Sequence, residues 1–178
     1  MKEEIKNTTT LTEEEIIRFQ TFHMNVAHRG TLIFNILLCV ILFIMGAVIL
    51  IKDHNNWGYA YFLLGVIYLV YRLMMPKQTA KLMIARDPNV LNLTNTYVFG
   101  KKDITVSGND FSSKVTYDKV YRIYETNQNF YLYMDRNQAY ILAKDGFEQG
   151  KVEELTKFLK QKLQKKFKDK KKEVAKAN

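Results

Sequence analysis

Two long apolar runs near the start of the chain constrain its fold more than any other feature. The runs Thr31–Ile51 and Trp57–Met75 are separated by only five residues, and the first contains no charged side chain. A helix rises 1.5 Å per residue, so about 20 residues cross a hydrocarbon core of about 30 Å. Because a bilayer offers the backbone no hydrogen-bonding partners, both runs are expected to be helices of a transmembrane hairpin, residues 31–75.

Basic residues outside the hairpin predict its orientation. Arg18 and Arg29 precede the first run, whereas the short connecting loop holds one lysine and one aspartate. Four further basic residues stand at the end of the second run or beyond it: Arg72, Lys77, Lys81 and Arg86. Positively charged flanks stay in the cytoplasm, so the chain is expected to be a multi-pass membrane protein with both termini cytoplasmic.

Residues 1–30 are expected to form an N-terminal cytosolic amphipathic segment. Thr12 and Glu15 have the spacing of a helix capping box, and apolar side chains recur at helical spacing after them. The first ten residues leave two alternatives open, a short strand or a loose end. Residues 76–94 are expected to be a connecting helix and linker, with Pro76 ending the second membrane helix or beginning the next one.

The hydrophobic period changes to two within residues 95–164. Short alternating stretches are separated by polar turns, such as Ser107–Asp110 and Thr126–Asn129. This pattern predicts five or six antiparallel strands in a meander. An amphipathic helix is expected at Lys151–Lys165. The fold class is therefore α+β, with a transmembrane hairpin followed by a cytosolic meander that the last helix closes, the layout of a pleckstrin-homology-like (PH-like) domain.

The order of these stretches resembles a known family. An acidic helix start, Leu11–Glu14, precedes the hairpin. The sheet region then contains Tyr97–Phe99, Val115–Val120, the aromatic Asn129–Tyr133 and Ala139–Lys144. In this order the chain resembles the YcxB-like membrane proteins of bacteria. The resemblance implies the bacterial inner (plasma) membrane and a PH-like C-terminal domain, and it implies no established activity.

The end of the chain is strongly basic. Between Lys151 and Asn178, eleven lysines face four acidic residues, a net charge of +7 within a chain of net charge +9. Such a tail is expected to contact anionic lipid headgroups, and the alternative is a solvated tail. Nucleic acid is not expected as a partner, because the tail has no arginine and few aromatics. The residues predicted for lipid contact lie in the Lys-rich tail 165–178: Lys165, Lys166, Lys168, Lys170, Lys171 and Lys172.

Residues that commonly carry chemistry are scattered along the chain. His23 and His28 are five apart, whereas metal-binding pairs on a helix are three or four apart. Six tyrosines crowd the predicted sheet, where they either pack in the core or form an exposed binding face: Tyr117, Tyr121, Tyr124, Tyr131, Tyr133 and Tyr140. No catalytic constellation, metal site or cofactor site is predicted, so the chain is not expected to be an enzyme.

The sequence therefore predicts a membrane-anchored, non-enzymatic binding or scaffolding protein. Its cytosolic domain would contact an unidentified protein partner or an anionic lipid surface. The alternative is a small transport or pore component made by oligomerisation of the hairpin. Asn35, within the first run, leaves three alternatives open: a hydrogen bond across the hairpin, a hydrogen bond to another protomer, or a tolerated amide near the start of the helix.

Overall fold

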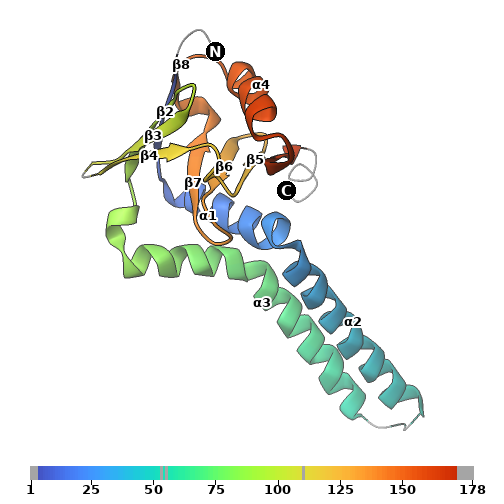
Figure 1. Ribbon diagram of the computed structural model, residues 1–178. Coiled ribbons are helices and arrows are strands. Elements are labelled where there is room, and N and C mark those ends of the chain that lie inside the picture. Colours follow the sequence, from blue (N-terminus) through green and yellow to red (C-terminus); the bar gives the residue numbers. More distant parts are fainter. Residues whose placement is uncertain (1–3, 53, 55, 110, 172–178) are drawn as a thin grey trace. The chain divides into compact units, whose positions relative to one another are not determined.

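The computed structural model describes residues 4–52, 54, 56–109 and 111–171 (Figure 1). The chain divides into two compact units, and each is described separately. The sheet unit comprises Met1–Glu15 together with Asp87–Asn178, and the hairpin unit comprises Ile16–Arg86. The hairpin unit is therefore an insertion within the sequence of the sheet unit.

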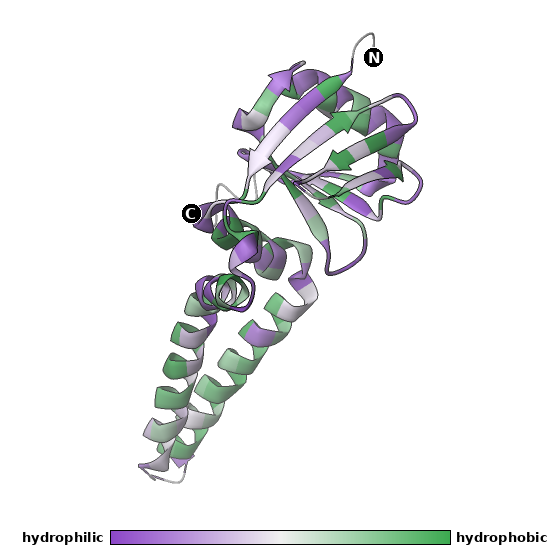
Figure 2. Cartoon of the chain, turned by 90° about the vertical axis from the view of Figure 1, so that its left-hand side faces the viewer, coloured by the Kyte–Doolittle hydropathy of each residue, from purple (hydrophilic) through white to green (hydrophobic). Residues whose placement is uncertain are grey.

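Helices make up the hairpin unit. They are α1 (Glu13–Phe22), a π-helical turn η1 (His23–Ala27), α2 (Arg29–Lys52) and α3 (Trp57–Arg86). The first residues of α1 belong to the sheet unit, and the Glu15 N–H donates to Thr12 Oγ1 at 3.2 Å, as expected of a helix cap. Both α2 and α3 are long and apolar enough to cross a membrane, judged by length and composition. Figure 2 shows hydrophobic residues along both helices.

The two long helices pack through small residues. Gly46, Gly58 and Gly65 are buried, and a Cβ added at Gly46 would lie 2.9 Å from the carbonyl oxygen of Gly58. Backbones this close tolerate only glycine. The Tyr68 hydroxyl donates to Asn35 Oδ1 at 2.9 Å, so the Asn35 amide forms its hydrogen bond across the hairpin.

The second long helix is longer than the sequence predicted. Pro76 lies inside α3, which continues to Arg86, so the expected break at Pro76 was wrong. Figure 1 shows that α3 bends along its length. Proline removes one helical hydrogen bond and commonly kinks a helix without ending it. The expected stop before Asp87 and Pro88 is confirmed, and a 3₁₀ turn, η2 (Pro88–Val90), follows.

Nine strands and one helix make up the described part of the sheet unit. The first sheet, sheet A, has the order β4-β3-β2-β1-β8, and the second, sheet B, has the order β7-β6-β5-β9. The strands of sheet A are β1 (Ile5–Thr10), β2 (Thr94–Phe99), β3 (Asp103–Ser107), β4 (Ser112–Thr116) and β8 (Phe147–Gln149). The strands of sheet B are β5 (Arg122–Glu125), β6 (Asn129–Tyr133), β7 (Ala139–Ala143) and β9 (Phe167–Asp169).

The first strand shows how the insertion is arranged. β1 pairs with β2 along its whole length, from Ile5 opposite Phe99 to Thr10 opposite Thr94. The segment 1–30, expected to be one cytosolic piece, is thus divided between sheet A and the helices. Leu11 continues the pairing through a hydrogen bond of 2.9 Å to the Leu93 carbonyl. Both connections to the hairpin unit therefore leave from the same end of sheet A.

Two polar side chains of β1 join the sheets. Asn7 and Thr9 are buried, where Asn7 Nδ2 donates to the Ala143 carbonyl at 2.7 Å and the Ala143 N–H donates to Thr9 Oγ1 at 2.9 Å. Between the sheets lies an apolar core, to which α4 (Val152–Leu163) contributes Leu155, Leu159 and Leu163. Beyond α4, a 3₁₀ turn η4 (Gln164–Lys166) leads into β9, and another, η3 (Lys144–Gly146), precedes β8.

The α+β class is confirmed, but the arrangement differs from a single meander. There are two sheets in place of one, and β9 pairs with β5 in parallel. The sequence missed β8 and β9, which have three residues each, and it left β1 open as a short strand or a loose end. All three pair with strands far away in the chain. The consecutive strands β2 to β4 and β5 to β7 pair as expected, in antiparallel fashion across local turns.

Candidate functional site

The lysine-rich segment predicted for lipid contact is part of the sheet unit as far as the structure describes it. After α4 and η4, β9 places Phe167 opposite Ile123 and Asp169 opposite Glu125. Phe167 is buried in the core, which fixes the strand at its start. Lys172 lies outside the described residues. The described part of the predicted tail 165–178 is thus folded onto β5.

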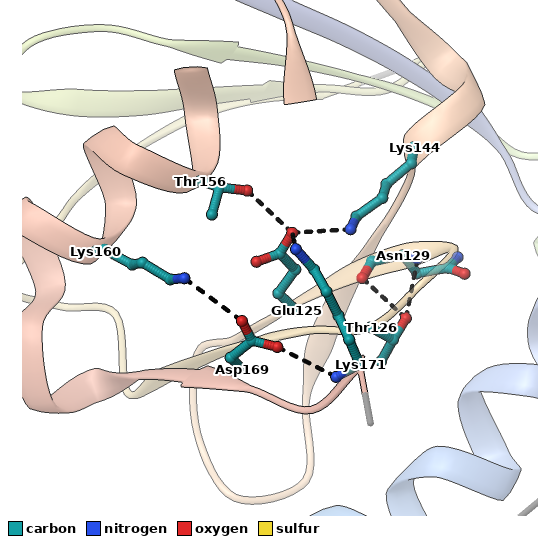
Figure 3. Close-up of polar contacts among 8 residues, drawn as sticks. All are labelled: Glu125, Thr126, Asn129, Lys144, Thr156, Lys160, Asp169 and Lys171. Atoms are coloured by element: carbon teal, nitrogen blue, oxygen red, sulfur yellow. Dashed lines mark hydrogen bonds and ion pairs between the residues drawn. The ribbon is translucent and has the colours of Figure 1, made fainter. Parts of the chain in front are cut away.

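A buried carboxylate holds the end of this segment (Figure 3). Glu125 is fully buried, and its Oε1 lies 2.8 Å from Lys144 Nζ and 2.7 Å from Lys171 Nζ. Thr156 of α4 donates to the same oxygen at 3.0 Å. The Lys170 N–H also donates to the Glu125 carbonyl at 2.8 Å. A carboxylate removed from water requires such donors, so Glu125 fastens η3 (Lys144–Gly146), α4 and the C-terminal segment to β5.

Lys166 is held in a second way. Its ammonium donates to the carbonyl oxygens of Asp118 and Val120, each at 2.7 Å. Lys166 and Lys171 therefore direct their charges to their own domain. Lys165 and Lys168 are exposed on the surface. Of the predicted lipid-contact residues, the structure leaves these two most open to a partner.

Helix α4 adds cations that the sequence prediction did not include. Lys157, Lys160 and Lys162 are exposed on α4. Lys160 pairs with Asp169 at 3.4 Å, and Lys162 Nζ lies 5.6 Å from the centroid of the Tyr117 ring. Four exposed lysines are called the α4 basic face below: Lys157 and Lys162 of α4, Lys165 of η4 and Lys168 of β9. The signal for the first two was the excess of lysine, which begins in the sequence at Lys151.

The pKa of Asp169 reflects the charges near it. Burial alone would raise this pKa, but the backbone N–H of Lys171 and the charges of Lys171 and Lys160 outweigh it and lower the pKa. Asp169 is therefore ionised at neutral pH and supports the ion pair with Lys160.

The two histidines are brought together by an unusual turn. His23 and His28 flank the π-helical turn η1, in which the His28 N–H donates to the His23 carbonyl at 3.0 Å. A five-residue hydrogen-bonding period places them on one side, with ring centroids 4.4 Å apart. The five-residue spacing, unusual for a pair on an α-helix, thus brings the two rings together because the turn between them is π-helical. Burial, and then the charge of His28, lowers the pKa of His23.

Most of the crowded tyrosines are buried. Tyr117, Tyr124, Tyr131 and Tyr133 are nearly inaccessible, and only Tyr121 of the six is exposed. Burial raises the pKa of Tyr117 and of Tyr133, so both stay protonated at neutral pH. The Tyr117 hydroxyl donates to the Gly100 carbonyl at 2.8 Å. The structure therefore shows most of these tyrosines packed in the interior rather than forming an exposed aromatic face.

Among the described residues, no group of three or more histidine, cysteine, aspartate or glutamate side chains could hold a metal ion. Cys39 is buried and free.

Part of this site lies in a segment that matches a known protein family. Residues 99–159 match the YcxB-like protein family. The matched part runs from the end of β2, through β3 to β8, into α4. No curated protein and no solved structure matched the chain.

The family match confirms the resemblance and has clear limits. It covers about a third of the chain, from Phe99 to Leu159. Lys157 of the α4 basic face lies inside the YcxB-like segment, whereas the other three lysines of this face lie beyond it. The two long apolar helices also lie outside the match.

Proposed function

We propose that this chain is a membrane-anchored, non-enzymatic binding protein of the bacterial inner membrane. In this proposal α2 and α3 span the bilayer with both termini in the cytoplasm, and the sheet unit is a PH-like module. The exposed α4 basic face then contacts an acidic surface, either anionic lipid headgroups or an acidic protein partner. The proposal includes no catalytic step.

One observation carries the anchoring part of the proposal. The large apolar side chains of α2 and α3 point outward, whereas the buried residues of these helices include Gly46, Gly58 and Gly65. Exposed apolar surface of this extent is unfavourable in water and favourable in lipid. The order of the strands and the C-terminal helix α4 support the PH-like layout.

The binding part of the proposal rests on positive charges that the fold leaves exposed to solvent. Lys165 and Lys168 are exposed, and Lys157 and Lys162 present further ammonium groups from α4. Each lysine near an anionic leaflet contributes about 1 kcal/mol. A module tethered to the same bilayer needs little intrinsic affinity, because its effective concentration at the surface is high.

Photo-crosslinking of the full-length protein in native membranes tests the proposal. The variant Lys157→Glu/Lys162→Glu/Lys165→Glu reverses the α4 basic face. The matched control reverses three exposed lysines of the β-turns, Lys101, Lys102 and Lys119. We expect crosslinks to phosphatidylglycerol analogues or to one reproducible protein, lost in the first variant and kept in the control. Crosslinks that are absent from the wild type, or unaffected by the first variant, would overturn the binding role.

Particle size addresses the alternative of an oligomeric pore. The hydrogen bond from Tyr68 to Asn35 is formed within one hairpin and does not involve a second protomer. We therefore expect a monomer in a mild detergent, measured by light scattering. A stable ring-sized oligomer would favour the pore instead.

A further inference from the structure

Helix α3 is longer than one crossing of a bilayer requires. It has 30 residues, which corresponds to a length of about 45 Å. A hydrocarbon core of about 30 Å takes about 20 residues, and this length, counted from Trp57, ends at Pro76. The remaining residues, 77–86, are called the α3 extension below.

Contacts within the hairpin unit place the α3 extension beyond the pair of long helices. The approaches of Gly46 to Gly58 and of Asn35 to Tyr68 show that α2 and α3 are antiparallel. Since α2 begins at Arg29, six residues before Asn35, it lies beside α3 only as far as about residue 74. Figure 1 shows the last part of α3 running in a different direction from the part beside α2. The extension therefore leaves the axis of the span.

The exposed side chains of the α3 extension are basic or apolar. Lys77, Lys81 and Arg86 are exposed, as are Leu82 at 58% and Met83 at 39%. α3 contains no acidic residue, and none of the three basic side chains pairs with an acidic side chain of the described residues. The positive charge of the extension is therefore not neutralised by the part of the chain that the structure describes.

One side of the extension is covered and the others are open. Ala80 is fully buried, and Gln20 Nε2 of α1 donates to Met83 Sδ at 3.8 Å. Lys77 and Lys81 are four residues apart, so they lie on the same side of the helix. Leu82 is one position further round, about 100° from Lys81. A lysine stem can lie along apolar lipid while its ammonium group stays among headgroups, so a bilayer surface accommodates all of these side chains.

We propose that the α3 extension lies along the cytoplasmic surface of the bilayer that α2 and α3 span, with its basic side chains on anionic headgroups and Leu82 at the acyl boundary. The occupant is lipid because the extension continues a proposed membrane helix without a break. Its charge is also entirely positive, which complements an anionic leaflet. This contact is separate from the α4 basic face, and it rests on the proposed membrane anchoring.

Spin labels on the full-length protein test this contact. The chain has one cysteine, Cys39, so a Cys39→Ala background allows single labels at chosen positions. One label replaces Leu82 in the extension, and another replaces Leu64 within the span; both side chains are exposed. The protein is reconstituted in vesicles of phosphatidylcholine, with or without phosphatidylglycerol. Collision rates with oxygen and with a water-soluble nickel complex give the depth of each label, calibrated with lipids labelled at known positions.

The Leu82 label reports the position of the extension. In vesicles with phosphatidylglycerol, we expect its depth to be that of the acyl boundary. The variant Lys77→Gln/Lys81→Gln should raise its nickel collisions at least two-fold, and omission of phosphatidylglycerol should do the same. The matched control, Lys157→Gln/Lys162→Gln, removes two exposed lysines of α4 and should leave the Leu82 label unchanged.

Four outcomes would overturn the inference. The first is a Leu82 label as open to nickel as a nitroxide in water, because the extension would then point away from the bilayer. The second is protection from both nickel and oxygen, since a protein surface would then cover the extension. The third is an unchanged depth in Lys77→Gln/Lys81→Gln. The fourth is an equal rise of nickel collisions in the α4 control, which would make the effect one of total charge.

The Leu64 label separates failure of this inference from failure of the anchoring. It should be protected from nickel and reached by oxygen, because Leu64 lies within the span of α3. If the Leu64 label is open to nickel, the membrane anchoring is wrong. If the Leu64 label is protected while the Leu82 label is open to nickel, the anchoring stands and only the contact of the α3 extension is wrong.

Discussion

The hairpin unit and the sheet unit bury opposite kinds of residue. In the sheet unit the largest fully buried side chains are aromatic, among them Tyr97, Phe99 and Phe130. In α2 and α3 the buried positions include Gly46 and Gly58, while large aliphatic side chains are exposed along both helices. Water drives large apolar groups inward, whereas in lipid close packing of small residues holds helices together. This difference is expected if the hairpin unit lies in lipid, as proposed, and the sheet unit lies in water.

Polar groups follow the same division. The sheet unit contains a buried carboxylate, Glu125, whose Oε1 accepts from two ammonium groups and a hydroxyl. The hairpin unit uses a neutral pair between its two long helices, Asn35 with Tyr68. Arg72, near the C-terminal end of the second apolar run, donates to Asn25 Oδ1 at 3.0 Å. An ion is costly to desolvate, so each unit uses the kind of polar contact that its surroundings allow.

Truncating one leucine in each unit should give the largest difference in stability between the two units. Leu159 of α4 is fully buried and Leu64 of α3 is 54% exposed. Leu159→Ala should lower the unfolding free energy of the sheet unit by about 2–5 kcal/mol, since it leaves a cavity. Leu64→Ala should change stability by less than about 0.5 kcal/mol. Denaturant unfolding in a mild detergent, followed by near-ultraviolet circular dichroism, measures both. Equal losses would break the comparison.

Removing the buried charge should have the next largest effect. Glu125→Gln leaves the ammonium groups of Lys144 and Lys171 without their carboxylate, and we expect a loss of about 3 kcal/mol in the same assay. This is at the low end for a buried pair, because the two lysine side chains are 14% and 39% exposed. Lys160→Gln, which breaks the exposed pair with Asp169, should cost less than about 1 kcal/mol. A neutral outcome for Glu125→Gln would show that the cluster does not fasten the C-terminal segment.

Much of the secondary structure could be predicted from local patterns. The apolar runs, the helix start at Thr12 and strand β7 at Ala139–Ala143 agree with the structure. The sequence left β1 open between a short strand and a loose end, because Ile5–Thr10 has no apolar alternation. Its alternate buried positions hold Asn7 and Thr9, whose partner, Ala143, is more than 130 residues away.

Only the positive net charge of the candidate site could be predicted from the sequence. The excess of lysine after Lys151 is plain in the sequence, but the use of each ammonium group depends on distant partners. Lys171 faces Glu125, and Lys166 faces the carbonyls of Asp118 and Val120. The sequence of a polybasic segment does not show whether its charges contact lipid or their own domain. Three-dimensional pairing alone separates Lys165 and Lys168 from the rest.

Glycine packing in the hairpin unit should show an effect of intermediate size. At Gly58 an added Cβ would lie 2.7 Å from the Gly46 carbonyl oxygen and collide with the Leu50 side chain. Gly58→Ala should therefore destabilise the pairing of α2 and α3 by about 1–3 kcal/mol. Gly30→Ala is the matched control, because nothing lies within 4 Å of the added atom. Alanine favours a helix, so this control should be neutral or gain up to about 1 kcal/mol.

Both glycine variants are titrated with dodecyl sulfate in mixed micelles, and spin labels on α2 and α3 report when the two helices separate. The dodecyl sulfate fraction at which they separate measures the effect of each change. If Gly58→Ala behaved like Gly30→Ala, close backbone contact would not be what holds the hairpin together.

The smallest effect is expected for the neutral hydrogen bond between the long helices. Tyr68→Phe removes only the hydroxyl that donates to Asn35 Oδ1. Hydrogen bonds between membrane helices contribute on average about 0.6 kcal/mol, because the separated helices find other partners. Tyr71→Phe, at an exposed position on the same helix, is the matched control and should change nothing. The same mixed-micelle assay detects the difference. A loss above about 2 kcal/mol would mean that the Asn35 amide has no other partner in lipid, and the hairpin unit would then depend on a polar contact as strongly as the sheet unit depends on Glu125.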